Sequence, residues 1–113
     1  MDARLAATPG HSAAVVWLDR SHALIARAHQ GLPAVTEIDC EQDLEANYLL
    51  RVAREAQGCD RVVIMGPDAS RIAFEREYVA LYRRPDRLID VGLVSTPEAR
   101  DLVRQLRLIE PAR

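Results

Sequence analysis

The segment RVVIMGP, residues 61–67, decides the fold, because an apolar run ends there abruptly at a Gly-Pro pair. A continuous apolar run of this length predicts a strand buried on both faces, as in a parallel sheet. Apolar residues then recur at helical spacing on one stripe, at Phe74, Tyr78, Leu81 and Tyr82. Asp68 or Ser70 is expected to cap this helix, which should end near Arg84 because Pro85 disfavours a helical predecessor.

Three short strands are expected before this segment, at residues 13–19, 23–29 and 34–39. Each segment either contains several β-branched residues or alternates apolar with polar residues. The second link is predicted to be a turn over residues 30–33, which read Gln-Gly-Leu-Pro. Because the links are short, the three strands should form an antiparallel meander.

Two further helices and a fifth strand complete the pattern. A period of four residues predicts a helix from Asp43 to just before Gly58. Residues 88–94 are expected to form the fifth strand. A last helix should begin at Thr96-Pro97-Glu98, with proline and an acid in its first turn. Its inner face is predicted to hold Ala99, Leu102, Val103 and Leu106.

This order of elements predicts an α/β fold. Antiparallel strands followed by strand–helix alternation imply a mixed five-stranded sheet flanked by helices, which is the ribonuclease-H-like arrangement. We expect a flexible N-terminal tail at residues 1–12 and a single domain at residues 13–110.

Three segments carry a resemblance to a known family: VVWLDRSHALI at 15–25, RVVIMGPDASRIAFEREY at 61–78 and RLIDVGLVSTPEARDLV at 87–103. They resemble small bacterial translational machinery proteins, which are similar to the middle domain of archaeo-eukaryotic peptide chain release factors and of Pelota. The matching positions are Trp17, Asp19, Gly66, Pro67, Ala69, Arg71, Thr96 and Pro97. Arg71 stands close to where those relatives usually carry a lysine.

The resemblance implies a ribonuclease-H-like fold and a link to translation. Release factors also carry a Gly-Gly-Gln loop that promotes peptidyl-tRNA hydrolysis. These 113 residues contain no Gly-Gly-Gln. The resemblance therefore argues against peptide release.

Composition excludes several chemistries. All 15 basic residues are arginine, so there is no lysine for a Schiff base or a P-loop. A net charge of −2 is not that of a polycation built to coat nucleic acid. The two cysteines are expected to be reduced, and no apolar stretch is long enough for a secretory signal or a membrane span. The expected compartment is the cytoplasm.

Charge is unevenly distributed along the chain. Residues 1–60 carry five arginines against nine acids, whereas residues 61–113 carry ten against eight. Arginine suits RNA, since its planar fork binds phosphate and stacks on bases. The predicted RNA-binding residues are Arg71, Arg76, Arg83, Arg84, Arg87, Arg100 and Arg104. The alternative is that neighbouring acids pair with these arginines on ordinary solvated helix faces.

A second hypothesis is a metal-dependent ribonuclease-H-like nuclease or hydrolase. It would use carboxylates at Asp19, Glu45 and Asp68, since such sites gather carboxylates around two magnesium ions. The structural alternative for each is a hairpin turn at Asp19, a helix cap at Asp68 and a solvent-facing Glu45.

The favoured function is a non-catalytic, translation-associated binding module that contacts RNA, the ribosome or a protein partner through an arginine-bearing face. No catalytic residue, metal ligand or cofactor is assigned, and no membrane partner is expected. A third hypothesis is self-association without catalysis, with the third strand pairing edge to edge in a homodimer.

Overall fold

The computed structural model describes residues 12–29, 31–40, 45–92 and 95–109. The first three strands are β1 (Ala13–Leu18), β2 (His22–His29) and β3 (Leu32–Asp39). They are followed by α1 (Glu45–Glu55), β4 (Arg61–Met65), α2 (Asp68–Tyr82), the short helix η2 (Pro85–Arg87), β5 (Leu88–Asp90) and α3 (Ala99–Ile109).

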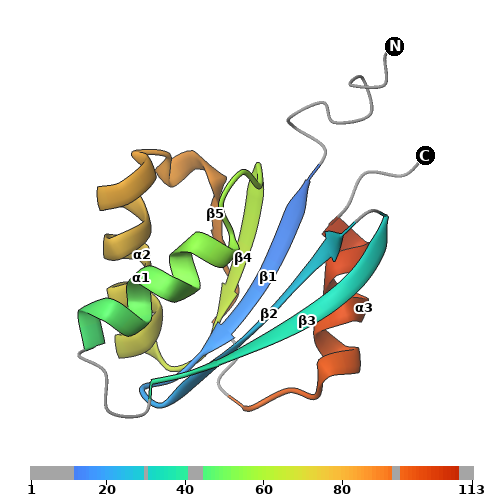
Figure 1. The fold of residues 1–113 in the computed structure, drawn as a ribbon, viewed down its shortest axis with the longest axis horizontal. Coiled ribbons are helices and arrows are strands. Elements are labelled where there is room, and N and C mark those ends of the chain that lie inside the picture. The colour runs from blue at the N-terminus through green and yellow to red at the C-terminus, as the bar shows by residue number, and fades with distance from the viewer. Residues whose placement is uncertain (1–11, 30, 41–44, 93–94, 110–113) are drawn as a thin grey trace.

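The five strands form one mixed sheet in the order β3-β2-β1-β4-β5. β2 pairs antiparallel with both β1 and β3, and β4 pairs parallel with both β1 and β5. Helices α1 and α2 cover one face of the sheet and α3 covers the other (Figure 1). The predicted α/β fold with a mixed five-stranded sheet is therefore confirmed.

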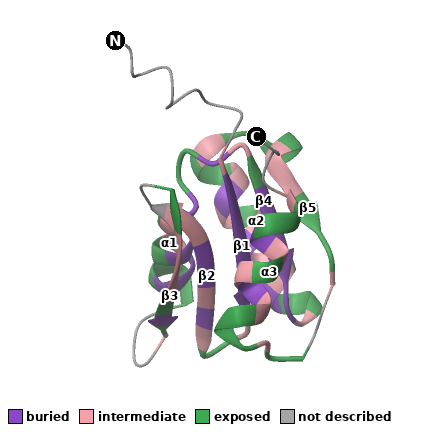
Figure 2. Cartoon of the chain, turned by 90° about the vertical axis from the view of Figure 1, so that its right-hand side faces the viewer, coloured by how far each residue is buried: buried purple, intermediate pink, exposed green. Residues whose placement is uncertain are grey.

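The central strand β1 builds both hydrophobic cores, and all six of its residues are buried. Its alternate residues Ala14, Val16 and Leu18 pack toward α1 and α2. The other three residues, Ala13, Val15 and Trp17, pack toward Leu102 and Leu106 of α3. Burial is concentrated in β1 and β4 and decreases toward the strands at the edges (Figure 2). An apolar run without alternation is what a strand covered on both faces requires.

Gly66 allows β4 to turn into α2 close to the end of β1. Its φ is +127°, and a Cβ placed there would lie 2.1 Å from the carbonyl oxygen of Leu18. Only glycine combines this backbone conformation with so close an approach. The turn therefore brings the carboxyl ends of β1 and β4 together.

Several predicted boundaries differ from the structure. The turn expected at residues 30–33 is tighter, because Leu32 and Pro33 belong to β3 and pair with His29 and Ala28. A proline is tolerated there because β3 is an edge strand. The fifth strand ends at Asp90, and residues 93–94 lie outside the described part.

The helix ends also differ in detail from the predictions. The residue before α2 is Pro67, which makes no side-chain capping hydrogen bond, so neither Asp68 nor Ser70 is the cap. Asp43 lies outside the described residues. On α3, Leu102 and Leu106 are buried as predicted, but Ala99 is exposed and Val103 half-buried. Among the described residues, no helix has the length and apolar character needed to cross a membrane.

Candidate functional site

The sheet divides the seven predicted RNA-binding arginines between its two faces. The set on or just after α2 comprises Arg71, Arg76, Arg83, Arg84 and Arg87. The set on α3 comprises Arg100 and Arg104. Because α2 and α3 cover opposite faces (Figure 1), the seven residues do not form one continuous patch.

Arg71 is used inside the chain. Its side chain is only 13% exposed, and its Nε donates a hydrogen bond of 2.8 Å to the carbonyl oxygen of Gly66. Its two terminal nitrogens pair with the carboxylates of Asp68 and Asp90. This arginine therefore ties the first turn of α2 to the β4 turn and to the end of β5. Its donors are engaged within the chain, which leaves the other six arginines as candidates for RNA.

Arg76 and Arg83 are exposed, and neither forms an ion pair with any other residue in the described ranges. Arg83 ends α2 in the left-handed conformation, with φ of 56°, and its N–H donates to the carbonyl oxygen of Val79 at 2.9 Å. A left-handed residue at this position stops the helix and satisfies one of its last carbonyl groups.

The two arginines in the turn after α2 are partly engaged. Arg84 makes a two-point contact with the carboxylate of Asp86, at 3.0 and 2.9 Å, and its side chain remains 49% exposed. Arg87 is half-buried near Tyr78. Burial raises the pKa of the Tyr78 hydroxyl, and the Arg87 guanidinium opposes that rise. Arg84 therefore presents positive charge to solvent more fully than Arg87 does.

The arginines of α3 have acidic neighbours on the same solvated face. Arg100 lies 2.7 Å from a carboxylate oxygen of Glu98, and Arg104 lies 3.9 Å from one of Asp101. Their side chains are 77% and 71% exposed. Exposed pairs of this kind contribute about 0–1 kcal/mol, so they can be exchanged for other partners at little cost.

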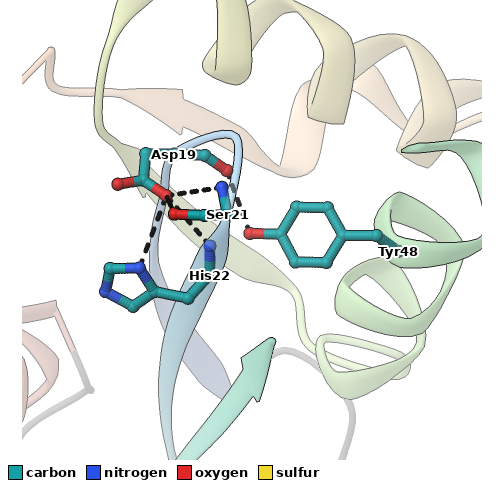
Figure 3. A network of polar contacts seen from close by, with 4 residues as sticks. All are labelled: Asp19, Ser21, His22 and Tyr48. Atoms are coloured by element: carbon teal, nitrogen blue, oxygen red, sulfur yellow. Dashed lines mark hydrogen bonds and ion pairs between the residues drawn. The ribbon is translucent and has the colours of Figure 1, made fainter. Parts of the chain in front are cut away.

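Asp19 organises the turn between β1 and β2 (Figure 3). Its Oδ1 accepts hydrogen bonds from the Ser21 N–H at 2.8 Å, the Ser21 hydroxyl at 3.1 Å and the His22 N–H at 2.9 Å. The Tyr48 hydroxyl on α1 donates to the Asp19 carbonyl oxygen at 3.0 Å. Burial acts to raise the pKa of Asp19, but the hydrogen bonds from His22 and Ser21 outweigh it and lower that pKa. The structural alternative for Asp19, a hairpin turn, is what the structure contains.

The three carboxylates of the nuclease hypothesis serve separate purposes. Asp19 belongs to the hairpin turn, Asp68 pairs with Arg71, and Glu45 is exposed at the start of α1. Within the described ranges, no three His, Cys, Asp or Glu side chains form a group that could hold a metal ion. The predicted alternative centre of Asp19, Glu45 and Asp68 is therefore not assembled in this fold.

Glu75 and Asp90 form a pair of neighbouring carboxyl groups between α2 and β5. Burial and the contact with Asp90 raise the pKa of Glu75 to about 7, while Arg71 acts in the opposite direction. One oxygen of Glu75, Oε2, is buried and has no hydrogen-bond partner among the described groups. The carboxyl group of Glu75 is therefore partly protonated near neutral pH.

A cleft of about 470 Å³ opens beside the hairpin turn and is lined by Arg20, Ser21, His22, Glu37, Asp39 and Cys40. The His22 ring packs against Trp17, with ring centroids 5.2 Å apart, and its Nδ1 lies 3.4 Å from Asp19. Cys59 is buried elsewhere, and burial raises the pKa of its thiol. His11 and the side chain of His29 lie outside the described part.

Sequence reasoning overlooked the network that joins Asp90, Arg71 and Glu75. The spacing of Arg71 and Glu75, four residues apart on one helix, is a sequence signal for contact. Asp90 carries no such signal, since it reaches α2 only when β5 pairs with β4. The hairpin network did have a local signal, because an aspartate two residues before a serine is typical of a turn closed by its own side chain.

The fold matches one part of several solved translation proteins. Pelota from Archaeoglobus fulgidus superposes with a TM-score of 0.63 at 14% identity, covering 86% of this chain and 31% of that protein. The archaeal translation termination factor aRF1 gives a TM-score of 0.56 at 15% identity, over 88% of this chain and 35% of that protein. Pelota from Thermoplasma acidophilum gives a TM-score of 0.56 at 19% identity, over 83% of this chain and 31% of that protein.

This chain therefore spans about a third of the length of these three proteins. At such low identities, the likeness establishes a shared fold. No model of a protein family matches the sequence, and no curated protein matches it either.

Proposed function

We propose that this chain is a translation-associated binding module that contacts RNA through the arginines at the end of α2. The observation that carries the proposal is the fold, which matches part of Pelota and of a translation termination factor. Fold alone does not fix function, so the proposal also rests on the side chains available at the surface. A partner on the ribosome would place the protein in the cytoplasm.

The surface at the end of α2 supplies the chemistry that RNA requires. Arg83 and Arg84 project from consecutive positions where the helix stops, and both are exposed. Arg54 on α1 acts electrostatically on Tyr82, which places a further arginine near this end of α2. Closely spaced guanidinium groups can contact successive phosphates, and such contacts account for most sequence-independent affinity.

The decisive experiment compares two matched double variants. R83Q/R84Q removes two arginines at the end of α2, and R100Q/R104Q removes two from α3 on the other side of the sheet. Binding to a fluorescently labelled RNA hairpin is measured by anisotropy at several salt concentrations. We expect R83Q/R84Q to weaken binding about tenfold and to reduce the salt dependence, because each lost phosphate contact lowers the slope by about 1.

Three outcomes would contradict this proposal. RNA binding that is absent from the wild-type protein at low salt removes the RNA contact altogether. An equal loss in both double variants would mean that only total charge matters. A loss confined to R100Q/R104Q would move the contact to α3. Co-sedimentation of the same variants with purified ribosomes tests the link to translation separately.

A further inference from the structure

The outer face of α2 has a charge pattern of its own. This face points away from the core residues Phe74 and Tyr78. At 3.6 residues per turn, its members lie within about 60° of one line along the helix. They are Asp68, Ile72, Glu75, Arg76, Val79 and Arg83. We call this set the outer stripe of α2.

The middle part of the outer stripe is apolar and lines a groove on the surface of α2. A cleft of about 530 Å³ runs along it and is lined by Ile72, Glu75, Arg76, Val79 and Ala80. Ile72 is 47% exposed, although isoleucine is among the residues most often buried. No other described element covers this groove, so its apolar side chains face solvent.

The charges of the outer stripe run from acidic to basic along the helix. Asp68 opens it, Glu75 and Arg76 lie at its centre, and Arg83 closes it. Asp68 pairs with Arg71 yet remains 82% exposed. Arg76 forms no ion pair with a described residue, and Glu75 lines the same cleft beside it while it neighbours Asp90. Glu75 and Arg76 cannot satisfy each other, because adjacent side chains on a helix point in different directions.

We propose that the outer stripe of α2 packs antiparallel against the outer stripe of a second copy of this chain. A twofold axis near the centre of the stripe would set Glu75 opposite the partner's Arg76. The same axis sets Ile72 opposite the partner's Val79, and Asp68 opposite the partner's Arg83. Because the interface is symmetric, each contact occurs twice.

Self-complementarity is what favours a second copy over other occupants. An RNA strand would meet Asp68 and Glu75 in the first half of the stripe, and their carboxylates repel phosphate. An antiparallel copy places each acid against an arginine and also opposes the two helix dipoles favourably. One pair of 15-residue helices buries less surface than a stable dimer needs, so the contact should be weak and reversible.

The inference is independent of the proposed RNA contact, although the two share Arg83. RNA bound at the end of α2 would compete with the second copy for that side chain. If both proposals hold, adding RNA lowers the fraction of dimer. If only one of them fails, the experiment that tests the other still gives its expected result.

The test is sedimentation equilibrium of the full chain at pH 8, where the carboxyl of Glu75 is ionised. We expect a reversible dimer with a Kd on the order of 100 µM, as for small transient interfaces. R76E sets acid against acid at the two central contacts, and E75R sets arginine against arginine. Each variant should weaken the dimer about tenfold or more.

An equimolar mixture of R76E and E75R provides the rescue. In that heterodimer both central contacts again join an acid to an arginine, so affinity should return to within about threefold of the wild type. R104E makes the same charge change on α3 and should leave the dimer unchanged. Thermal unfolding followed by circular dichroism verifies that every variant is folded.

A wild-type protein that remains monomeric at about 1 mM would overturn the proposal. So would a dimer that persists in both R76E and E75R, which would point to the exposed edge of β3 instead. A mixture that stays as weak as the single variants would exclude the antiparallel register.

Discussion

The hydroxyl of Tyr48 on α1 donates a hydrogen bond of 3.0 Å to the backbone carbonyl oxygen of Asp19, which begins the turn between β1 and β2. The contact joins a helix to a hairpin that is 29 residues away in sequence. Burial raises the pKa of Tyr48, so the hydroxyl remains a donor at physiological pH.

Tyr48→Phe removes the hydroxyl donor, so the carbonyl oxygen of Asp19 loses this hydrogen bond. We expect a loss of about 1–2 kcal/mol in the free energy of unfolding, measured by urea denaturation. Tyr82→Phe is the matched control, since the half-buried Tyr82 hydroxyl has no hydrogen bond to a described residue. Equal effects of the two substitutions would show that the Tyr48 hydrogen bond contributes nothing specific.

Asp19→Ala removes the acceptor of the turn, and Asp19→Asn retains an oxygen while losing the charge. We expect Asp19→Ala to cost about 2 kcal/mol at pH 7 and Asp19→Asn about half as much. Since the pKa of Asp19 is lowered on folding, its stabilisation is present above the unfolded value of 3.8. It is lost as pH falls through the lower, folded pKa. Urea midpoints of wild type and Asp19→Ala should therefore converge in acid, and a constant gap would refute this assignment.

Glu75 has the opposite pH dependence. Its pKa is about 7 in the folded protein against an ordinary value of 4.5, so folding favours the protonated form. That contribution is fully present below pH 4.5 and is lost as pH rises through 7. We expect wild-type stability to fall by about 1 kcal/mol between pH 5 and pH 8 from this group.

Glu75→Gln should remove most of that slope, because glutamine keeps the shape of the protonated acid without titrating. Glu77→Gln, also half-buried on α2, is the control and should leave the slope intact. Chemical denaturation at a series of pH values measures both. A slope that is identical in wild type and Glu75→Gln would mean that other groups cause it.

Gly66→Ala should be the most disruptive small substitution in the described chain. The added Cβ would lie 2.1 Å from the carbonyl oxygen of Leu18, where the backbone of β1 cannot yield, and φ of +127° adds strain. We expect a loss of more than about 3 kcal/mol, or failure to fold. Gly31→Ala, at φ of +84° with no atom within 4 Å, should cost only about 1 kcal/mol. Thermal melts distinguish the two, and similar losses would disprove the role of the close approach.

Much of the fold can be predicted from the sequence. The spacing of apolar residues changes from every second to every fourth residue where the three antiparallel strands end. The apolar run of β4 predicted a strand buried on both faces, and the structure confirms it. The run Gln-Gly-Leu-Pro predicts a turn that includes Pro33, but this proline pairs within β3, where it is tolerated because β3 is an edge strand.

The surface was harder to predict than the core. The sequence predicts Arg71 to be available for RNA, because its partner Asp90 is 19 residues away and reaches it only when β5 pairs with β4. The division of the arginines between two faces likewise depends on which side of the sheet each helix crosses. The periodicity of the sequence indicates neither the contact between Arg71 and Asp90 nor the face of the sheet on which each helix lies.

The tilted contact between the rings of His22 and Trp17 gives the protein an intrinsic optical probe. Trp17 is the only tryptophan in the chain, it is 1% exposed, and its ring centroid lies 5.2 Å from that of His22. The emission of this single indole therefore reports on its surroundings in the folded protein without any added label. Because β1 carries this indole into the core beneath α3, the same signal follows the opening of that core during unfolding.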